Sequence, residues 1–224
     1  VGTAQGIIDD TLEFIKARMA DAAYAAAEAA RFVRALVSHG TTTASVFGAH
    51  FAPAVASLFD AAGRAGIRIA AGLVLSDRRL RDDLHVSPEA AHRDSTDLIR
   101  RFHERGRLLY SVTPRFALST SPAILEVCQT LLGEHPTVRC PTHLPEQQAE
   151  IDEVARLFPW ASDYLHVYER FGLTGGRSIM AHDVHVTASQ LERLAGSGTS
   201  VAHCPASNAA LGSGIFPFRR HREA

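Results

Sequence analysis

The chain has 224 residues, of which 46% are hydrophobic and 21% are charged, a composition typical of one folded domain and unlike that of a disordered chain. Its 23 Lys and Arg residues nearly balance 24 Asp and Glu residues, and a formal charge of −1 argues against the basic surface of nucleic-acid or anionic-membrane binders. The three cysteines lack CxxC spacing, and no apolar run is long enough for a membrane span, so we expect a cytoplasmic protein without disulfides.

Helices and strands are predicted to alternate along the chain. The Ala-rich segment from Asp10 to His39 predicts one helix that ends at Gly40. Strands are predicted over residues 41–47, 67–75, 107–113, 137–143, 177–182 and 199–204. Helices are predicted over residues 53–65, 87–105, 146–157 and 163–171, and from residues 121 and 187 onwards.

About six β-α units predict a parallel sheet covered by helices. A (β/α)8 barrel of the TIM type is favoured over a doubly wound sheet, because polar residues follow several different strands and no Gly-rich phosphate loop follows the first. We expect a single domain over residues 1–224.

His143 and Glu146 follow the fourth predicted strand in an HxxE pattern. A histidine at a strand end can offer a neutral imidazole nitrogen to a divalent ion, and a carboxylate three residues later can exchange a proton with a water bound to that ion. The alternative is a surface histidine beside a glutamate that stabilises the start of the next helix. His182 ends the fifth strand in the same way, and its alternative is a buried histidine bonded to a backbone carbonyl.

Other polar residues near these strand ends are assigned no metal or catalytic role. Asp183 would orient an imidazole or be solvated, while His185 and His203 are expected to pack or form hydrogen bonds.

Arg115 and Phe116 follow the third strand and suit a purine, since a planar guanidinium can donate to ring oxygens or nitrogens and an aromatic face can stack on the heterocycle. The alternative for this pair is an arginine at a helix start beside a core phenylalanine.

Several segments together resemble the guanine deaminases of the amidohydrolase superfamily. They are residues 106–117 (GRLLYSVTPRFA), Thr142-His143-Leu144-x-Glu146, Ala181-His182 and residues 204–214 (CPASNAALGSG). The resemblance runs from about Ala20 to Arg220 and implies a zinc hydrolase of the TIM-barrel type. The implied reaction converts guanine and water to xanthine and ammonia through attack of a zinc-bound hydroxide.

The same resemblance implies roles for individual residues. His143 and His182 would bind zinc, Glu146 would carry the proton, and Arg115 and Phe116 would hold and stack the purine. Asn208 lies in a matching motif without a defined role. The resemblance also implies a homodimer for the full-length form.

The chain departs from the family pattern at both ends. No His-x-His metal pair precedes Thr41, and no eighth-strand aspartate follows, so the predicted strands correspond to the second to seventh of eight. Three hypotheses follow: a guanine deaminase whose other ligands are supplied by flanking sequence, a related amidohydrolase acting on another heterocycle, or an inactive remnant with an incomplete barrel.

Overall fold

The computed structural model describes residues 13–224, in which parallel strands alternate with helices. The strands are β1 (Thr43–Phe47), β2 (Arg68–Gly72), β3 (Val74–Leu75), β4 (Leu108–Tyr110), β5 (Thr113–Pro114), β6 (Cys140–His143), β7 (Ser178–Ala181) and β8 (Ser200–Ala202). The helices are α2 (Ala22–Ser38), α3 (Ala52–Ala65), α4 (Pro88–Phe102), α5 (Pro122–Glu134), α6 (Gln148–Leu157), α7 (Tyr164–Arg170), α8 (Ala188–Ser197), α9 (Pro205–Leu211) and α10 (Phe218–Glu223). Two short 3-10 helices, η1 (Asp82–Leu84) and η2 (Ala117–Ser119), lie in the connections.

The strands occupy six consecutive parallel strand positions of a (β/α)8 barrel, here called staves, which confirms the predicted fold class. The staves are β1, β2 with β3, β4 with β5, β6, β7 and β8. β1 pairs with β2 and β2 with β4, while β3 and β5 continue the second and third staves as a separate pair. An isolated parallel bridge between Ser111 and Arg139 links the third stave to the fourth, and β6, β7 and β8 complete the order. Parallel staves place all their carboxyl ends at one rim, where barrel enzymes carry their chemistry.

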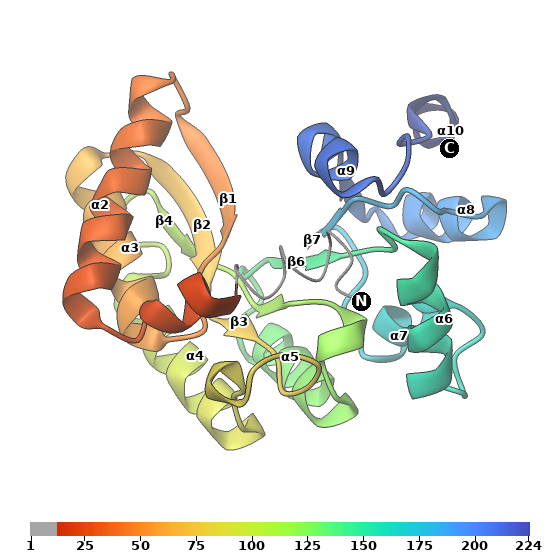
Figure 1. Ribbon diagram of the computed structural model, residues 1–224, viewed down its shortest axis with the longest axis horizontal. Coiled ribbons are helices and arrows are strands. Elements are labelled where there is room, and N and C mark those ends of the chain that lie inside the picture. Colours follow the sequence, from red (N-terminus) through yellow and green to blue (C-terminus); the bar gives the residue numbers. More distant parts are fainter. Residues whose placement is uncertain (1–12) are drawn as a thin grey trace.

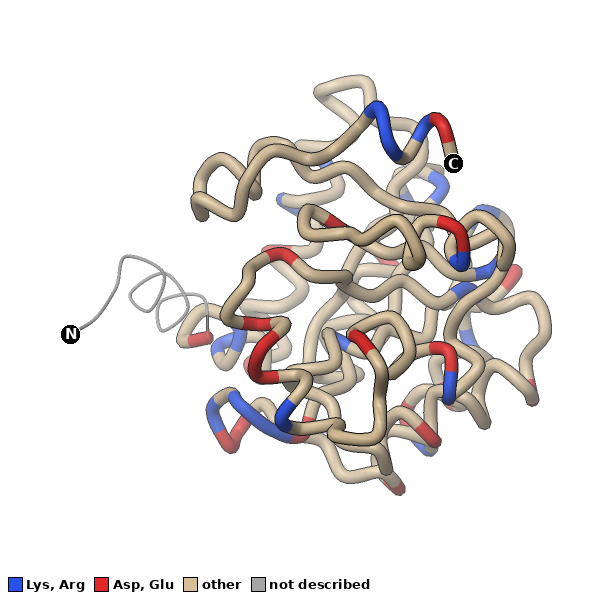
Figure 2. The backbone as a smooth tube through the Cα atoms, turned by 90° about the vertical axis from the view of Figure 1, so that its right-hand side faces the viewer, with Lys and Arg blue, Asp and Glu red and all other residues tan. Residues whose placement is uncertain are grey.

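The helices lie outside the strands, with α2 and α3 beside β1 and β2 and with α8, α9 and α10 at the opposite end of the molecule (Figure 1). α2 shows why the sequence folds this way: Ala25, Ala29 and Val33 recur at helical spacing and are buried, while most of its other residues are exposed. Basic and acidic positions are interspersed over the described chain (Figure 2). In the part of the chain that the structure describes, no helix is long and apolar enough to cross a membrane.

Three predicted elements, one helix and two strands, were wrong in extent. The single helix expected from Asp10 to His39 is interrupted, because residues 19–21 form a turn and the Asp21 carboxylate accepts a hydrogen bond from the Tyr24 N–H at 2.8 Å, which starts α2 as a separate helix. Residues 10–12 of that prediction lie outside the described residues.

The strands predicted over residues 67–75 and 107–113 are each divided in two. Gly72 lies at the division, and a Cβ atom there would come within 1.7 Å of the Ser111 carbonyl oxygen. The second and third staves therefore approach one another more closely at this point than two residues with side chains allow. Beyond it β3 and β5 resume the pairing, so that the chain still delivers Arg115 to the carboxyl rim.

Candidate active site at the carboxyl ends of the strands

The polar residues predicted at three strand ends meet in one cavity of about 400 Å³. Arg115 and Phe116 follow β5, His143 is the last residue of β6, and His182 follows β7 directly. The cavity is lined by Glu13, Arg79, Arg115, Phe116, Leu118, His143, Glu146, Gln147, Glu150, His182, Ser207 and Leu211. Its volume is within the range of small-molecule sites.

His143 is oriented by the stave before it. Its Nδ1 donates a hydrogen bond to the Arg115 carbonyl oxygen at 2.6 Å, and its ring lies against Phe47 and Phe116 with centroid separations of 4.4 and 6.1 Å. Burial among these groups lowers the pKa of the His143 imidazole to about 3, and the neighbouring His182 ring acts in the same direction. The imidazole is therefore neutral at physiological pH, which is the form that can ligate a metal.

Acid should destabilise the fold through His143. Its folded-state pKa of about 3 lies below the ordinary value of 6.5. Between these two pH values the unfolded chain therefore binds a proton at His143 more readily than the folded chain does. This contribution to stability is complete above the unfolded-state pKa and is lost as the pH falls toward the folded-state pKa. In urea titrations with a chelator present, His143→Gln should reduce the slope of unfolding free energy against pH by up to about 1.4 kcal/mol per pH unit. Equal slopes for the two proteins would contradict this expectation.

His182 is buried and is oriented by a side chain from α9. Its Nδ1 lies 2.8 Å from Asn208 Oδ1, so the imidazole donates and the amide oxygen accepts. Asn208 is itself only 2% exposed, and its Nδ2 has no hydrogen-bond partner in the described structure. The partner of His182 is thus a side chain, and not the backbone carbonyl considered as the alternative from sequence. Asn208 had no role assigned from sequence, and its position in the CPASN segment was the only signal.

The two imidazoles face each other as a stacked pair. Their centroids are 5.3 Å apart and their planes are inclined by 17°. Because Nδ1 of His143 donates to a carbonyl and Nδ1 of His182 donates to an amide oxygen, the Nε2 of each ring keeps its lone pair. The donor set therefore fits two ligands of a divalent ion such as zinc. No group of three or more His, Cys, Asp or Glu side chains placed to hold a metal occurs among residues 13–224.

Glu146 points across the cavity toward α9. Its Oε1 accepts hydrogen bonds from the Ser213 hydroxyl at 3.0 Å and the Ser207 hydroxyl at 3.4 Å, and it lies 3.4 Å from His182 Nδ1. The 2.8 Å contact with Asn208 is the closer partner of that nitrogen. The helix-start function considered for Glu146 belongs instead to Glu150, whose carboxylate accepts from the Glu146 N–H at 3.1 Å.

Glu150 also lines the cavity. Burial raises the pKa of its carboxyl group, and the hydrogen bond from the Tyr164 hydroxyl opposes that shift. Sequence reasoning had not selected Glu150, because a glutamate in the first turn of a helix is common. Its contact with the Glu146 N–H ties the candidate proton carrier to the first turn of α6.

Arg115 and Phe116 lie against one another, with the guanidinium carbon 4.9 Å from the ring centroid. Both line the cavity beside the histidines. His185 and His203 were expected to pack or form hydrogen bonds, and they do. His185 Nε2 donates to the Ser213 carbonyl oxygen, and the His203 ring stacks on Phe216.

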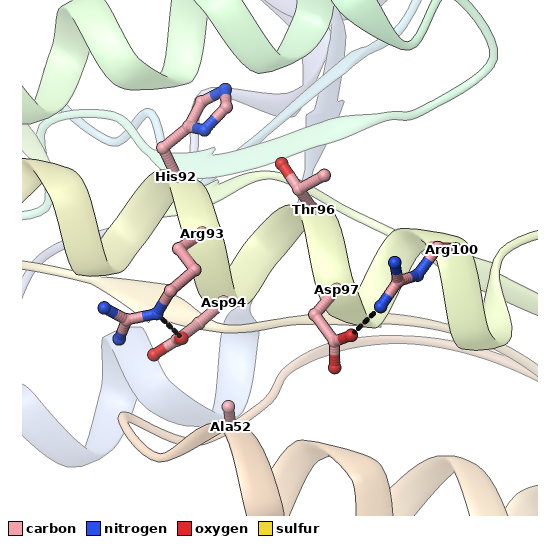
Figure 3. A pocket seen from close by; sticks show the side chains of 7 residues that line it. All are labelled: Ala52, His92, Arg93, Asp94, Thr96, Asp97 and Arg100. Carbon is pink, nitrogen blue, oxygen red and sulfur yellow. Dashed lines mark hydrogen bonds and ion pairs between the residues drawn. The ribbon is translucent and has the colours of Figure 1, made fainter.

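A larger hollow of about 570 Å³ lies on the outside of the barrel along α4. Its charged side chains pair with one another: Arg93 with Asp94 at 2.9 Å and Arg100 with Asp97 at 2.7 Å (Figure 3). Such self-paired charges are typical of a solvated helix face. We therefore assign the candidate site to the smaller cavity at the strand ends.

The chain was compared with known proteins by sequence and by structure. A sequence model of the Amidohydrolase family matches residues 2–223. The chain is 54% identical over 209 residues to a probable guanine deaminase of Deinococcus radiodurans, a match covering 93% of this chain and 48% of that protein. The structure of Escherichia coli guanine deaminase superimposes with a TM-score of 0.92 at 40% identity, covering 93% of this chain and 49% of the other.

A guanine deaminase structure from C. acetobutylicum with guanine bound in its active site superimposes with a TM-score of 0.90 at 27% identity, covering 93% of this chain and 50% of the other. The chain thus spans about half the length of the relatives it matches.

Proposed function

The chain belongs to the Amidohydrolase family, a generally metal-dependent group of hydrolases, and we propose that it carries part of the active site of a guanine deaminase. The observation that carries the proposal is the meeting of two stacked strand-end histidines, a carboxylate and an arginine–phenylalanine pair in one cavity. The similarity to guanine deaminases over more than nine tenths of the chain supports guanine as the substrate.

We propose zinc as the metal and His143 and His182 as two of its ligands. Each ring has its Nδ1 bonded to an oxygen and its Nε2 available to an ion, which suits this role, and further ligands would come from elsewhere in the protein. When bound, the ion would acidify a water molecule and so supply the nucleophile at neutral pH.

The chain's own residues would then perform the binding and the proton transfers. Arg115 donates hydrogen bonds to the polar edge of guanine, and Phe116 packs on its ring. As water oxygen bonds to C2 of guanine, Glu146 accepts a water proton, and it later returns a proton to the departing amine. The C2–N bond breaks, ammonia leaves, and the ring retains the oxygen as xanthine. Ser207 and Ser213, which donate to Glu146, hold its carboxylate in place during these transfers.

Arg115→Ala tests the purine site. In the protein expressed with its flanking coding sequence, the substitution should lower kcat/KM for guanine by about 10- to 100-fold, the loss associated with hydrogen bonds from a charged donor. The assay should compare guanine with adenine, cytosine and a triazine. Arg93→Ala, a change of the same kind on the outer face of α4, is the matched control and should retain most guanine turnover. Unchanged guanine kinetics in Arg115→Ala, or a faster reaction with another heterocycle, would refute the assignment to guanine.

A further inference from the structure

The turn that follows β7 has an unusual backbone. His182 and Asp183 have φ angles of 73° and 47°, both in the left-handed region that residues with a Cβ atom rarely adopt. Other non-glycine residues with positive φ in the described chain, Arg79 and Glu104, occur singly. Such a conformation persists only where surrounding contacts determine it.

Two successive side chains of this turn are held from different directions. The His182 imidazole bonds to Asn208 on α9, as described above. The Asp183 carboxylate instead accepts a hydrogen bond from His221 Nε2 on α10, with Oδ2 and Nε2 2.7 Å apart. Asp183 is 2% exposed, so the solvated alternative considered from sequence is excluded, and the imidazole that Asp183 contacts is that of His221.

His221 is itself fixed on its other sides. Its Nδ1 lies 3.2 Å from the Pro217 carbonyl oxygen, and its ring stacks on Phe216 at a centroid separation of 4.3 Å. The neighbouring Arg220 donates from Nη1 to the Val186 carbonyl oxygen at 3.0 Å. α10 contains no buried residue. Its hydrogen bonds to Asp183 and to the Val186 carbonyl oxygen connect this short helix to the segment that begins with His182.

We propose that His221, acting through Asp183, is a positioning residue that holds the left-handed turn after β7 and thereby fixes the direction of the His182 imidazole. The proposal rests on the proposed function in one respect, the metal-ligating role of His182. If the pair is lost, the turn is free to relax toward ordinary backbone angles, and the imidazole turns away from Asn208 and from His143. A buried carboxylate without its partner also favours this relaxation, because the turn must open for water to reach it.

The experiment compares His221→Ala with His221→Gln, which retains an N–H donor. The first readout is the imidazole nitrogen–proton NMR spectrum of His182 in the metal-free chain, which reports the hydrogen bond from Nδ1 and needs no activity. We expect His221→Ala to broaden or split the His182 signals and His221→Gln to restore them. The second readout is zinc affinity and kcat in the protein with its flanking sequence. Both should fall by at least about tenfold in His221→Ala, since loss of the contacts that orient a ligating histidine costs about 10- to 100-fold.

His92→Ala is the matched control, because His92 forms an exposed pair with the Glu134 carboxylate on the outer surface at 2.9 Å. It should leave the His182 spectrum unchanged. If His221→Ala unfolds the chain, the double variant Asp183→Asn/His221→Gln replaces the carboxylate and the imidazole while keeping a donor and an acceptor, and should retain the His182 signals. A folded His221→Ala protein with an unaltered His182 spectrum, or an equal change in His92→Ala, would overturn the proposal. Absence of guanine turnover in the unsubstituted protein would refute the proposed function and leave the spectroscopic test intact.

Discussion

Glu146→Gln should lower kcat for guanine by about 10²- to 10⁴-fold while the protein keeps its zinc. The amide is nearly the same size as the carboxylate and can still accept from the Ser207 and Ser213 hydroxyls, but it cannot take a proton from water. Glu146 is not among the two proposed metal ligands, so the metal content should be unaffected. Steady-state kinetics and zinc analysis of the same preparation check both parts.

Glu153→Gln is the control for this substitution. Glu153 lies on α6, close in sequence to Glu146, but its carboxylate pairs with Arg79 and Arg156 and does not line the cavity. Its replacement should leave turnover near that of the unsubstituted protein. Normal turnover in Glu146→Gln would remove the proton-transfer role, and loss of zinc there would show that the carboxylate belongs to the metal site.

His182→Ala should abolish both zinc retention and turnover. The imidazole is buried, stacks on His143 and donates from Nδ1 to Asn208. Its Nε2 is therefore the nitrogen available to bind an ion in the cavity that His182 lines. Removing one of the few ligands of a catalytic zinc leaves too few donors for tight binding. Metal analysis after dialysis against a chelator checks the result.

The Asn208 amide offers a matched comparison for His182→Ala. Asn208→Asp preserves an oxygen acceptor for Nδ1 and should retain zinc, whereas Asn208→Leu should weaken zinc binding by about 10- to 100-fold, as is usual when a partner of a ligating histidine is lost. Zinc retained by His182→Ala at the level of the unsubstituted protein would exclude His182 as a ligand.

The meeting of Arg115, Phe116, His143 and His182 could be predicted from sequence because each follows a strand of a parallel barrel. Alternation of strands and helices places all strand ends at one rim, and the position of a residue in the alternation then fixes its place in the fold. The spacing of His143 and Glu146 likewise predicted a carboxylate close to the histidines. These are local rules applied to successive units.

Other features depend on contacts that no local rule contains. The division of the strands at Gly72 arises from the close approach of the Ser111 carbonyl, which belongs to the next stave. The long first helix was predicted from alanine content, which obscured the capping signal of Asp21. Asn208 and His221 contact residues 26 and 38 positions away, and their choice of partner is set by where α9 and α10 pack.

The formation of xanthine and ammonia from guanine is the direct test of the proposed active site. The protein should be expressed with its flanking coding sequence, loaded with zinc and given guanine, and both products should be followed together. We expect equal amounts of xanthine and ammonia, formed at a rate that falls sharply in Glu146→Gln. A folded protein that retains zinc at His143 and His182 but leaves guanine unchanged would contradict it.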